Sequence, residues 1–318
     1  MPCFNSADFV AESIESILSQ TFTDFELILI DDGSTDATLG ILKQYAAKDN
    51  RIVVIEKEHT GSADSRNWGI RASQGGWIAI LDSDDIALPT RLEQQLAYVS
   101  KKPELVMLGS DFIPMGSSVY IIKKHHYPSK HYDLVKRLQR SMSFPPHSSF
   151  IYRTEIVKRI GGFNPRYVPS EDTDLYLRLA EQGRIAYMNK PLVKIRKHSN
   201  NISIGREETQ VLHALAAVVC HFLRNKNTPD PSACGKDEDW RAFVEWIALR
   251  AEQQELFERR RTRSQLTLRY FSSGYRLIGA WRLMTGLASS RHTFQILHEK
   301  YFGSDLATTL ADEWIRKL

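Results

Sequence analysis

Two carboxylates separated by one residue, Asp82-Ser83-Asp84, form the most informative chemical pattern in the sequence. They follow a short apolar run at 77–81 that has the length and composition of a buried strand. Carboxylates on a turn at a strand end can hold a hard divalent cation, because Mg²⁺ takes one or two protein carboxylates and leaves its other positions to water and substrate phosphates. Aspartate also populates turns for conformational reasons alone, so the pattern by itself leaves both interpretations open.

A second acidic group, Asp31-Asp32-Gly33-Ser34, ends an earlier apolar run at 25–30. An aspartate here can accept hydrogen bonds from a base or a ribose, and Gly33 lets the backbone approach a ligand closely. A turn in which Asp and Ser cap the next helix explains the same residues. This pattern alone is a weak signal.

The third acidic group opens a predicted helix, where Ser170 is in position to cap the first turn. The helix dipole explains Glu171 and Asp174 as ordinary charges of a first turn. Asp172 differs, because helical spacing places it on an apolar face. The residues that share this face are Leu175, Tyr176 and Leu179. We expect an inward carboxylate that the dipole keeps ionised, which is what a general base requires.

The elements that must position these groups alternate between strands and helices. Apolar spacing predicts helices at 10–18, 34–46 (with Ser34 as its N-cap), 61–72 and 89–99, and strands at 25–30, 52–55 and 77–81. This alternation is typical of an α/β domain with a parallel sheet, which binds ligands beyond the carboxyl ends of its strands. Both acidic turns fall there.

Residues 1–5 read as a turn that leads into the first helix, with no strand before it. A doubly wound domain should begin with a strand. We therefore hypothesise that the translation start lies several residues upstream and that Met1 ends the missing strand. An in-frame run of Val and Ile codons upstream would support this hypothesis.

The pattern changes after residue 205. An apolar helical stripe at 211–222, a polar segment at 225–239 and a further helical region from 240 follow. We predict an α/β domain at 1–205 and a helical C-terminal region at 206–318.

Composition favours a globular protein of a reducing compartment. Hydrophobic residues make up 42% of the 318 and the net charge of +4 is mild. The three cysteines, Cys3, Cys220 and Cys234, are too scattered for a disulfide framework. The sequence contains no zinc-finger spacing and no aromatic-basic RNA signature, so we expect no nucleic-acid partner.

The longest apolar stretches are too short to span a bilayer, so we expect a cytoplasmic protein. The basic run Arg259-Arg260-Arg261-Thr262-Arg263 follows an amphipathic helix. It either contacts anionic headgroups, as a peripheral contact at the inner face of the membrane, or is a solvated helix face.

Five motifs occur in the order found in the family 2 glycosyltransferases, which the chain resembles over about residues 1–205. They are Asp31-Asp32-Gly33-Ser34, Ser65-Arg66-Asn67-Trp68-Gly69-Ile70, Leu81-Asp82-Ser83-Asp84-Asp85, Gly161-Gly162-Phe163 and Glu171-Asp172-Thr173-Asp174-Leu175-Tyr176-Leu177-Arg178. In addition, Pro2-Cys3-Phe4-Asn5 matches the start of the family pattern. The resemblance implies a GT-A fold, an α/β fold with a mostly parallel sheet flanked by helices. The C-terminal helical appendage lies outside it.

The resemblance also implies the candidate site residues. Asp172 would be the catalytic base, and Asp82 and Asp84 would form a DxD site for Mn²⁺ or Mg²⁺, with Asp84 as the direct ligand. His198 matches a position that reaches the metal or the diphosphate in some members, although a solvated loop histidine explains it equally well. The residues expected to contact the substrate are Asp31, Asp32 (at the base), Arg66 (near the nucleotide), Asp82, Ser83, Glu171, His198 and His147, the last of which a structural role also explains.

By the same resemblance, the chain transfers a sugar from a nucleotide diphosphate, expected to be a UDP-sugar, with inversion. The acceptor would be a glycan or lipid-linked saccharide of bacterial surface polysaccharide. The Gln-x-x-Arg-Trp motif of processive members does not occur, which favours single transfers. Two alternatives stay open: a nucleotidyltransferase, expected to carry a Gly-rich phosphate loop that this sequence lacks, and a catalytically inactive sugar-nucleotide binder, expected to lack Asp84 or Asp172.

Overall fold

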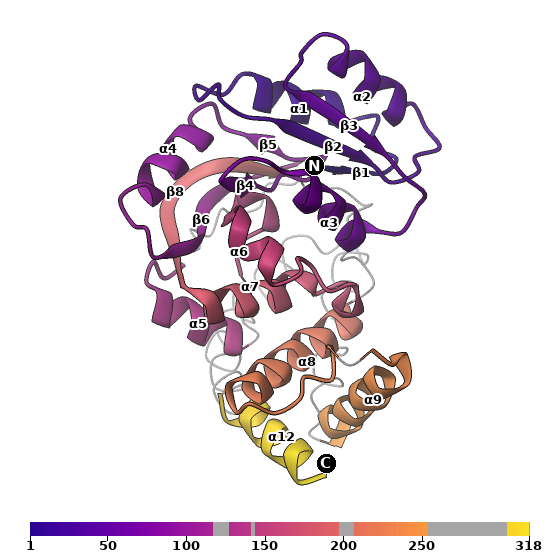
Figure 1. Ribbon diagram of the computed structural model, residues 1–318, viewed down its shortest axis with the longest axis vertical. Helices are drawn as coiled ribbons and strands as arrows, with labels where there is room; N and C mark the ends of the chain where they lie inside the picture. Colours follow the sequence, from indigo (N-terminus) through magenta and orange to yellow (C-terminus); the bar gives the residue numbers. More distant parts are fainter. Residues whose placement is uncertain (117–126, 141–143, 197–206, 234, 254–303, 318) are drawn as a thin grey trace, which may run out of the picture. The chain divides into compact units, whose positions relative to one another are not determined.

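The computed structural model describes residues 1–116, 127–140, 144–196, 207–233, 235–253 and 304–317 (Figure 1). The chain divides into two compact units. The first comprises Met1–Leu138 with Ser143–Gly205, and the second comprises Gln139–Met142 with Arg206–Leu318. Strands and helices make up the first unit, and the described part of the second is helical. His198 and the basic run at 259–263 lie outside the described residues.

A three-stranded parallel sheet carries the first acidic turn. In sheet order its strands are β1 (Pro2–Cys3), β2 (Leu27–Asp31) and β3 (Ile52–Glu56). The helices packed on it are α1 (Val10–Leu18), α2 (Thr38–Ala46) and α3 (Ser62–Ala72). Side chains of β2 alternate between its faces, so Leu27 and Leu29 join a core with α1 and α2, whereas Ile30 meets Gly69 of α3. Figure 1 shows α3 on the opposite side of the sheet from α1 and α2.

A five-stranded mixed sheet follows in the same unit. In sheet order its strands are β4 (Trp77–Ala79), β7 (Ile151–Arg153), β6 (Leu105–Met115), β8 (Arg184–Arg196) and β5 (Ile86–Ala87). β6 and β8 pair in parallel, and the other neighbours are antiparallel. The pairing of β6 with β8 contains shifts of register, and irregularities of this kind bend a strand in the way that β-bulges do. Figure 1 shows β8 as a long curved strand.

Short helices connect these strands and carry several candidate site residues. They are α4 (Arg91–Val99), α5 (His131–Gln139), α6 (Thr154–Arg159), α7 (Glu171–Gln182) and the 3₁₀ turns η1 (His147–Ser149) and η2 (Pro165–Tyr167). The acidic turn at 82–85 comes after β4, and the third acidic group begins α7. The predicted helix at 10–18 and strand at 52–55 are confirmed within one residue.

The start of the chain forms a strand, which corrects the expectation that residues 1–5 are a turn. β1 pairs in parallel with the end of β2, where Pro2 is opposite Ile30. The Met1 carbonyl accepts from the Ile30 N–H at 2.9 Å, and the Met1 α-amino group donates to the Ile28 carbonyl at 2.8 Å. The hydrogen-bond ladder therefore includes the first residue.

The predicted cap of the second helix is wrong. The N-cap position of α2 is Ala37, which makes no side-chain cap hydrogen bond. Asp36 Oδ1 accepts instead from the first N–H of α2 at 2.9 Å. Ser34 Oγ accepts from the Asn5 N–H at 3.1 Å, so it ties the chain start to the first acidic turn. Ser170 does hold the N-cap position of α7, but its side chain makes no cap hydrogen bond.

Three helices form the described part of the second unit: α8 (Glu207–Asn225), α9 (Asp237–Gln253) and α12 (Ser304–Lys317). Aromatic rings join α9 to α12, with the Trp314 centroid 4.9 Å from that of Phe243 and 5.0 Å from that of Trp246. Lys226, directly after α8, pairs with Asp312 of α12. Among the helices that the structure describes, none is long and apolar enough to cross a membrane.

Candidate functional site

Arg66 of α3 joins two of the acidic segments. Its Nη2 donates to Asp82 Oδ1 at 2.9 Å, and its Nη1 donates to Glu171 Oε1 at 3.0 Å. The side chains of Arg66 and Glu171 are each 10% exposed, and that of Asp82 is 31% exposed. The turn after β4 and the start of α7 therefore face the same small volume, and Asp172 directly follows Glu171. We call Arg66, Asp82 and Glu171 the ion-pair bridge.

Opposite charges keep Arg66 and Asp82 ionised. Burial alone lowers the pKa of Arg66, but the carboxylates of Asp82 and Glu171 reverse this effect and hold that pKa above its ordinary value. Burial also opposes the ionisation of Asp82, since it raises the pKa of this carboxyl. The charge of Arg66 outweighs the effect of burial, so the pKa of Asp82 is lowered overall. Arg66 and Asp82 are therefore both charged at neutral pH.

The Gly161-Gly162-Phe163 motif helps to position Arg66. The neighbouring Asn67 side chain accepts from the Phe163 N–H at 2.7 Å and donates to the Phe163 carbonyl at 2.8 Å. Gly162 has a φ of +69°, and a Cβ there would lie 2.3 Å from Asn67 Oδ1, so this approach requires glycine. The Arg66 guanidinium lies 5.6 Å from the Phe163 ring centroid, within cation–π range. The Gly-Gly-Phe motif thus contacts the guanidinium of Arg66 and also holds the neighbouring Asn67 side chain.

Backbone contacts hold the acidic turn in place. Ser13 Oγ of α1 donates to the Ser83 carbonyl at 2.9 Å. Arg196 Nε, at the end of β8, donates to the Asp84 carbonyl at 2.9 Å. Asp82 and Asp84 are both half-buried. Their carboxylates are therefore carried on a backbone that two other elements fix.

Asp85 is a residue of this turn that sequence reasoning did not select. It is buried, with its Oδ2 accepting from Ser148 Oγ at 2.5 Å and its Oδ1 accepting from the Arg196 N–H at 2.9 Å. Burial first, and then the charges of Asp82 and Asp84, raise the pKa of Asp85 to about 8. Asp85 is thus mostly protonated at pH 7 and links the turn to η1 and β8. The third aspartate in the motif was the signal that could have identified it.

Glu171 and Asp174 are not the solvent-exposed charges expected of a helix start. Glu171 is buried in the ion-pair bridge. Asp174 is fully buried and accepts from Arg178 Nη2 at 2.6 Å. Arg178 also donates to the Gly162 carbonyl at 2.7 Å. This second pair therefore anchors α7 to the glycine segment that helps to hold Arg66.

Asp172 is half-buried beside the ion-pair bridge. Its Oδ1 accepts from the Thr173 N–H at 2.7 Å. Burial, and then the charge of Glu171, raise the pKa of Asp172 to about 6, because they outweigh the lowering effects of the Thr173 N–H and of Arg66. The expected ionised carboxylate therefore agrees with this pKa at pH 7, although burial raises the pKa where the helix dipole alone would lower it. A carboxylate with a pKa near 6 is mostly deprotonated at pH 7, yet basic enough to accept a proton.

His147 of η1 lies among aromatic rings next to the bridge. Its Nδ1 is 2.9 Å from the Tyr176 hydroxyl, and its ring centroid is 5.2 Å from that of Phe163. Its Nε2 is buried and has no hydrogen-bond partner among the described residues. Burial, and then the charge of Arg66, lower the pKa of His147 to about 3. The ring is therefore neutral at pH 7, and in this form it can donate or accept a hydrogen bond.

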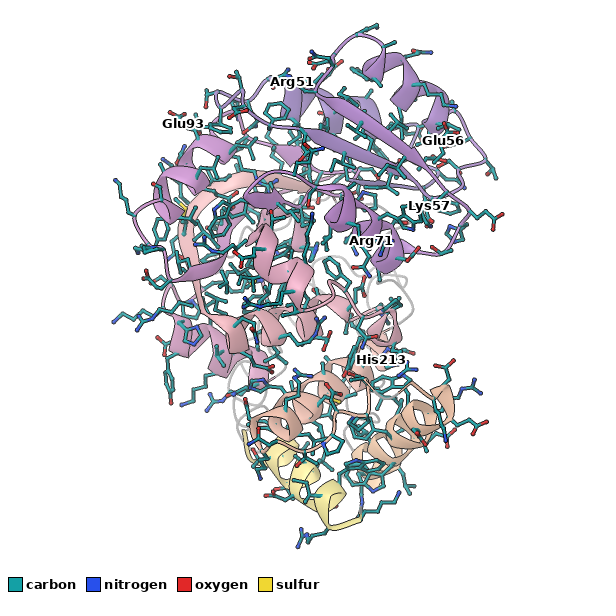
Figure 2. The ribbon with its side chains drawn as sticks, viewed as in Figure 1. Arg51, Glu56, Lys57, Arg71, Glu93 and His213 are labelled. Carbon is teal, nitrogen blue, oxygen red and sulfur yellow. The ribbon has the colours of Figure 1, made fainter. Side chains whose placement is uncertain are left out.

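The first acidic turn forms a second centre, and within the described chain no hydrogen bond joins Asp32 to the bridge. Asp32 Oδ1 accepts from Lys57, on the loop after β3 (Figure 2), and its Oδ2 accepts from the Gly61 N–H at 2.9 Å. Burial opposes ionisation, but Lys57 and the N–H groups of Thr60 and Gly61 hold the pKa of Asp32 below its usual value. Asp32 is therefore a fixed anion.

An exposed aromatic ring lies beside this anion. Phe4 is 45% exposed, and its ring stacks on that of His59 with 4.1 Å between centroids. His59 Nδ1 is 3.1 Å from the Asp32 carbonyl. Asp31 is buried, and its Oδ2 accepts from the Ser34 N–H at 3.1 Å. A flat ring next to a carboxylate suits a planar heterocycle, and Phe4 was not selected as a site residue from the sequence.

The described residues contain no group of three His, Cys, Asp or Glu side chains with metal-ligand geometry. A cation that is bound together with a diphosphate needs only one or two protein carboxylates, because phosphate oxygens and water complete its shell. Asp82 and Asp84 on the fixed turn fit that smaller requirement. His198, the third candidate ligand, lies outside the described residues.

The model of the family described as Glycosyl transferase family 2 matches residues 1–161. The chain is 28% identical over 247 residues to an uncharacterized glycosyltransferase, MJ1057, of Methanocaldococcus jannaschii. This match covers 76% of this chain and 83% of that relative. It is also 28% identical over 210 residues to the chondroitin synthase of Escherichia coli, over 66% of this chain and 30% of the synthase.

Solved structures share the fold. S. aureus TarS 1–349 in complex with UDP-GlcNAc is similar with a TM-score of 0.57 and 20% identity, over 76% of this chain and 68% of that one. The mannosyltransferase PcManGT from Pyrobaculum calidifontis, in complex with GDP-Man and Mn²⁺, is similar with a TM-score of 0.54 and 17% identity. The match covers 98% of this chain and 84% of the mannosyltransferase. The expected GT-A fold is confirmed.

Proposed function

The chain belongs to glycosyl transferase family 2, and from this membership we propose an inverting, non-processive enzyme that moves a sugar from a nucleotide diphosphate to an acceptor hydroxyl. The ion-pair bridge carries the proposal, because it joins a carboxylate turn of the metal-binding type to the segment that bears Asp172. We further propose that residues 1–205 carry the activity and that 206–318 form an appended helical region.

In this proposal, Asp172 takes the proton of the acceptor hydroxyl as its oxygen attacks the sugar. A positioned general base contributes about 10²–10⁴-fold to rate, and a pKa of about 6 leaves Asp172 deprotonated at neutral pH. Glu171 does not suit this role, because Arg66 already occupies it; it positions the first turn of α7. Attack from the face opposite the diphosphate inverts the anomeric configuration in one displacement.

The diphosphate leaves on the side of the acidic turn. A bound Mn²⁺ or Mg²⁺ would neutralise the charge that develops there, held by Asp84 with Asp82 and His198 as further candidate ligands. Arg66 adds a fixed positive charge, since its pKa stays high. Ser83 and the neutral His147 can add hydrogen bonds. The Mn²⁺ bound to PcManGT supports this choice of cation.

The nucleoside would bind at the second centre. Asp32, as a fixed anion, would accept hydrogen bonds from the base, and Asp31 would contact the same nucleoside. Bound UDP-GlcNAc and GDP-Man in the two structural relatives support a nucleotide-sugar donor, and we propose a UDP-sugar. The name chondroitin synthase supports a polysaccharide product, so we propose a glycan or lipid-linked acceptor. The cytoplasmic location and the peripheral membrane contact stay predictions.

Nucleoside diphosphate release from a panel of UDP- and GDP-sugars, with Mn²⁺ or Mg²⁺, tests the activity. One donor should be hydrolysed slowly even without an acceptor. Asp84→Asn should lose metal-dependent nucleotide binding in calorimetry, whereas Asp172→Asn should keep binding and lose transfer. Asp133→Asn changes an exposed aspartate in the first turn of α5 and should behave like the unmodified protein. In a separate reaction with a nucleoside triphosphate and a sugar 1-phosphate, release of pyrophosphate would identify a nucleotidyltransferase. Equal loss of binding in both site variants would contradict the separate roles.

A further inference from the structure

Arg91, the first residue of α4, is a completely buried cation. Among the described residues, no carboxylate forms an ion pair with it. Burial lowers the pKa of Arg91 to about 10, and the charge of Asp85 acts in the opposite direction, so the guanidinium is still charged at pH 7. Taking a charge out of water is costly. The contacts that this guanidinium makes must therefore account for its place.

Those contacts are backbone carbonyls and one amide side chain. Arg91 Nη2 donates to the Ile80 carbonyl at 2.8 Å and to the Phe150 carbonyl at 3.2 Å. Its Nε donates to Oε1 of Gln95, one turn further along α4, at 3.1 Å. Gln95 is also fully buried, and its Nε2 donates to the Ser149 carbonyl at 3.0 Å. We call Arg91 and Gln95 the α4 pair. It contacts both the residue after β4 and the end of η1.

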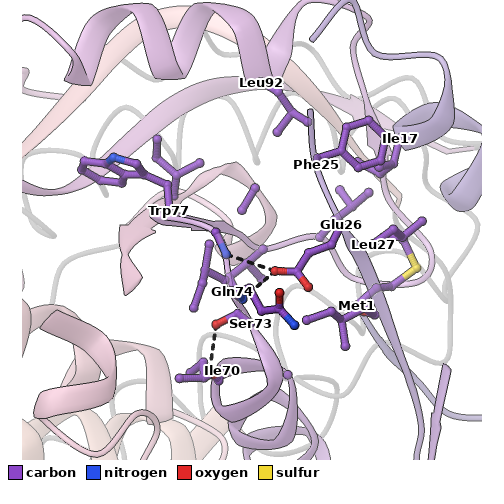
Figure 3. Close-up of a pocket in the computed structure, with 18 of the residues that line it drawn as sticks. Met1, Ile17, Phe25, Glu26, Leu27, Ile70, Ser73, Gln74, Trp77 and Leu92 are labelled. Atoms are coloured by element: carbon purple, nitrogen blue, oxygen red, sulfur yellow. Dashed lines mark hydrogen bonds between the residues drawn. The ribbon is translucent and has the colours of Figure 1, made fainter. Parts of the chain in front are cut away.

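An apolar cavity of about 630 Å³ adjoins the α4 pair (Figure 3). Its walls include Leu92 and Leu96 of α4, Trp77 of β4 and Ile80. Leu92 and Trp77 are labelled in Figure 3. Apolar walls favour an apolar neighbour over a charged one. Packing beside this cavity therefore gives no reason for a guanidinium, and the reason lies in the carbonyls that it binds.

The guanidinium takes the place of one hydrogen bond in a ladder. β4 and β7 pair antiparallel through the last residue of β4. At the next position, the Ile80 N–H still donates to the Phe150 carbonyl at 3.2 Å. A hydrogen-bonded antiparallel pair exchanges two such bonds, but the Phe150 N–H donates to the His147 carbonyl at 3.1 Å instead. Arg91 supplies the Ile80 carbonyl with the donor that is withdrawn in this way.

This exchange of partners allows η1 to form. The bond from the Phe150 N–H to the His147 carbonyl closes this 3₁₀ turn, so the chain enters β7 from a turn and not from an extended segment. The turn presents Ser148 to the acidic turn. Ser148 Oγ accepts from the Asp82 N–H at 3.0 Å and donates to Asp85 Oδ2 at 2.5 Å. One residue of η1 therefore fixes both ends of the acidic turn.

We propose that Arg91 is a positioning residue for sugar transfer: by replacing one hydrogen bond of the β4–β7 ladder, it holds η1 in the conformation that fixes the acidic turn. For its effect on catalysis, this role rests on the proposed function. Gln95 orients the guanidinium through Nε and holds the Ser149 carbonyl. Lysine does not replace arginine here, because its ammonium is a single point charge without a planar fork of donors. Arg91→Lys therefore keeps the charge and loses the contact with Gln95.

Amide hydrogen exchange tests the structural part of this role without any substrate. In Arg91→Lys, the amides of Phe150 and Asp82 should exchange at least about tenfold faster than in the unmodified protein, because η1 and its contact with the acidic turn open locally. The Leu27 amide, which donates to the Arg51 carbonyl in the first sheet at 2.8 Å, should keep its rate. A loss of global stability alone would instead speed exchange at all three amides.

Arg153→Lys is the matched control. Arg153 of β7 also donates to two backbone carbonyls, those of Leu105 at 3.0 Å and Pro103 at 2.9 Å. Its hydrogen bonds to the described residues do not reach η1 or the acidic turn. This variant should leave the exchange of the Phe150 and Asp82 amides unchanged, and faster exchange equal to that of Arg91→Lys would overturn the proposal.

Steady-state kinetics test the catalytic part. With a donor that the unmodified protein uses, Arg91→Lys should lower kcat by about tenfold or more, since small misplacements have effects of this size. The donor KM should change little, because the nucleoside would bind at the second centre, away from η1. If Arg91→Lys does not fold, Gln95→Met provides the test, because it keeps the cation, removes the acceptor of its Nε and should show the same pattern.

Three results would overturn the proposal: unchanged exchange of the Phe150 amide, equally faster exchange of the Leu27 amide, or a rise in KM with kcat unchanged. Failure of the proposed function gives a different result. In that case the unmodified protein transfers no sugar, whereas faster local exchange at Phe150 still supports the role of Arg91 in holding η1.

Discussion

Removing the cation of the ion-pair bridge is the most direct perturbation of this site. Arg66→Met keeps a long side chain with similar helix propensity, but it leaves Asp82 and Glu171 without their charged donor. Among the described residues, the remaining hydrogen-bond partner of the buried Glu171 carboxylate is the Ser62 hydroxyl at 3.2 Å. Asp82 is nearly one-third exposed, so water replaces part of its lost interaction.

The expected loss of folding stability in Arg66→Met follows from the burial of Glu171 and the partial exposure of Asp82. Removing one partner of a fully buried ion pair costs about 3–5 kcal/mol, and the exposure of Asp82 brings the estimate to about 3 kcal/mol. In a unit of about 200 residues, each kcal/mol lowers Tm by about 2–4 °C, so the midpoint should fall by about 6–12 °C. Arg71, labelled in Figure 2, is an exposed arginine of the same helix whose guanidinium lies over the Trp68 ring, and Arg71→Met should lower the midpoint by no more than about 2 °C.

The pH dependence separates lost charge pairing from lost packing. Because the pKa of Asp82 is lowered in the folded protein, its contribution is present above the unfolded-state pKa of about 3.9 and is lost as pH falls through the folded pKa. The difference in Tm between the unmodified protein and Arg66→Met should therefore be full at about pH 7 and shrink below about pH 4. Scanning calorimetry of the two proteins at neutral and at acid pH measures this difference in Tm. A fall under about 2 °C at neutral pH, or a difference that acid does not reduce, would refute the reasoning.

A pH profile and three other substitutions have definite expected outcomes. For the unmodified enzyme, kcat/KM should rise with pH through about 6 as Asp172 ionises. Because a raised carboxyl pKa means that ionisation destabilises the fold above that pH, Asp172→Asn should raise Tm at about pH 8 and not at about pH 4, by calorimetry; the opposite pattern would exclude the raised pKa. Gly162→Ala should lower Tm by about 2–6 °C, since its Cβ would lie 2.3 Å from Asn67 Oδ1. Gly40→Ala, on α2 with no atom within 4 Å of a new Cβ, should raise Tm by about 2 °C, and equal shifts at the two glycines would contradict the steric argument.

Sequence patterns were sufficient where the decisive neighbours are close along the chain. The helix at 10–18 and the strand at 52–55 follow from apolar spacing alone, and the order of the motifs indicated the family and its fold. Strand pairing was not readable in this way. β4 pairs antiparallel with β7, with Trp77 opposite Arg153, and nothing near either residue in sequence specifies the other.

The candidate site shows the same division. By itself, the sequence determined which chemical groups stand at two strand ends and at one helix start, because local spacing sets those positions. Tertiary structure alone decided their charge states and partners. Arg66 meets Glu171 across 105 positions, and Asp85 meets Arg196 across 111. Ionisation depends on desolvation and on such distant charges, which is why the raised pKa of Asp172 was not readable from its helix alone.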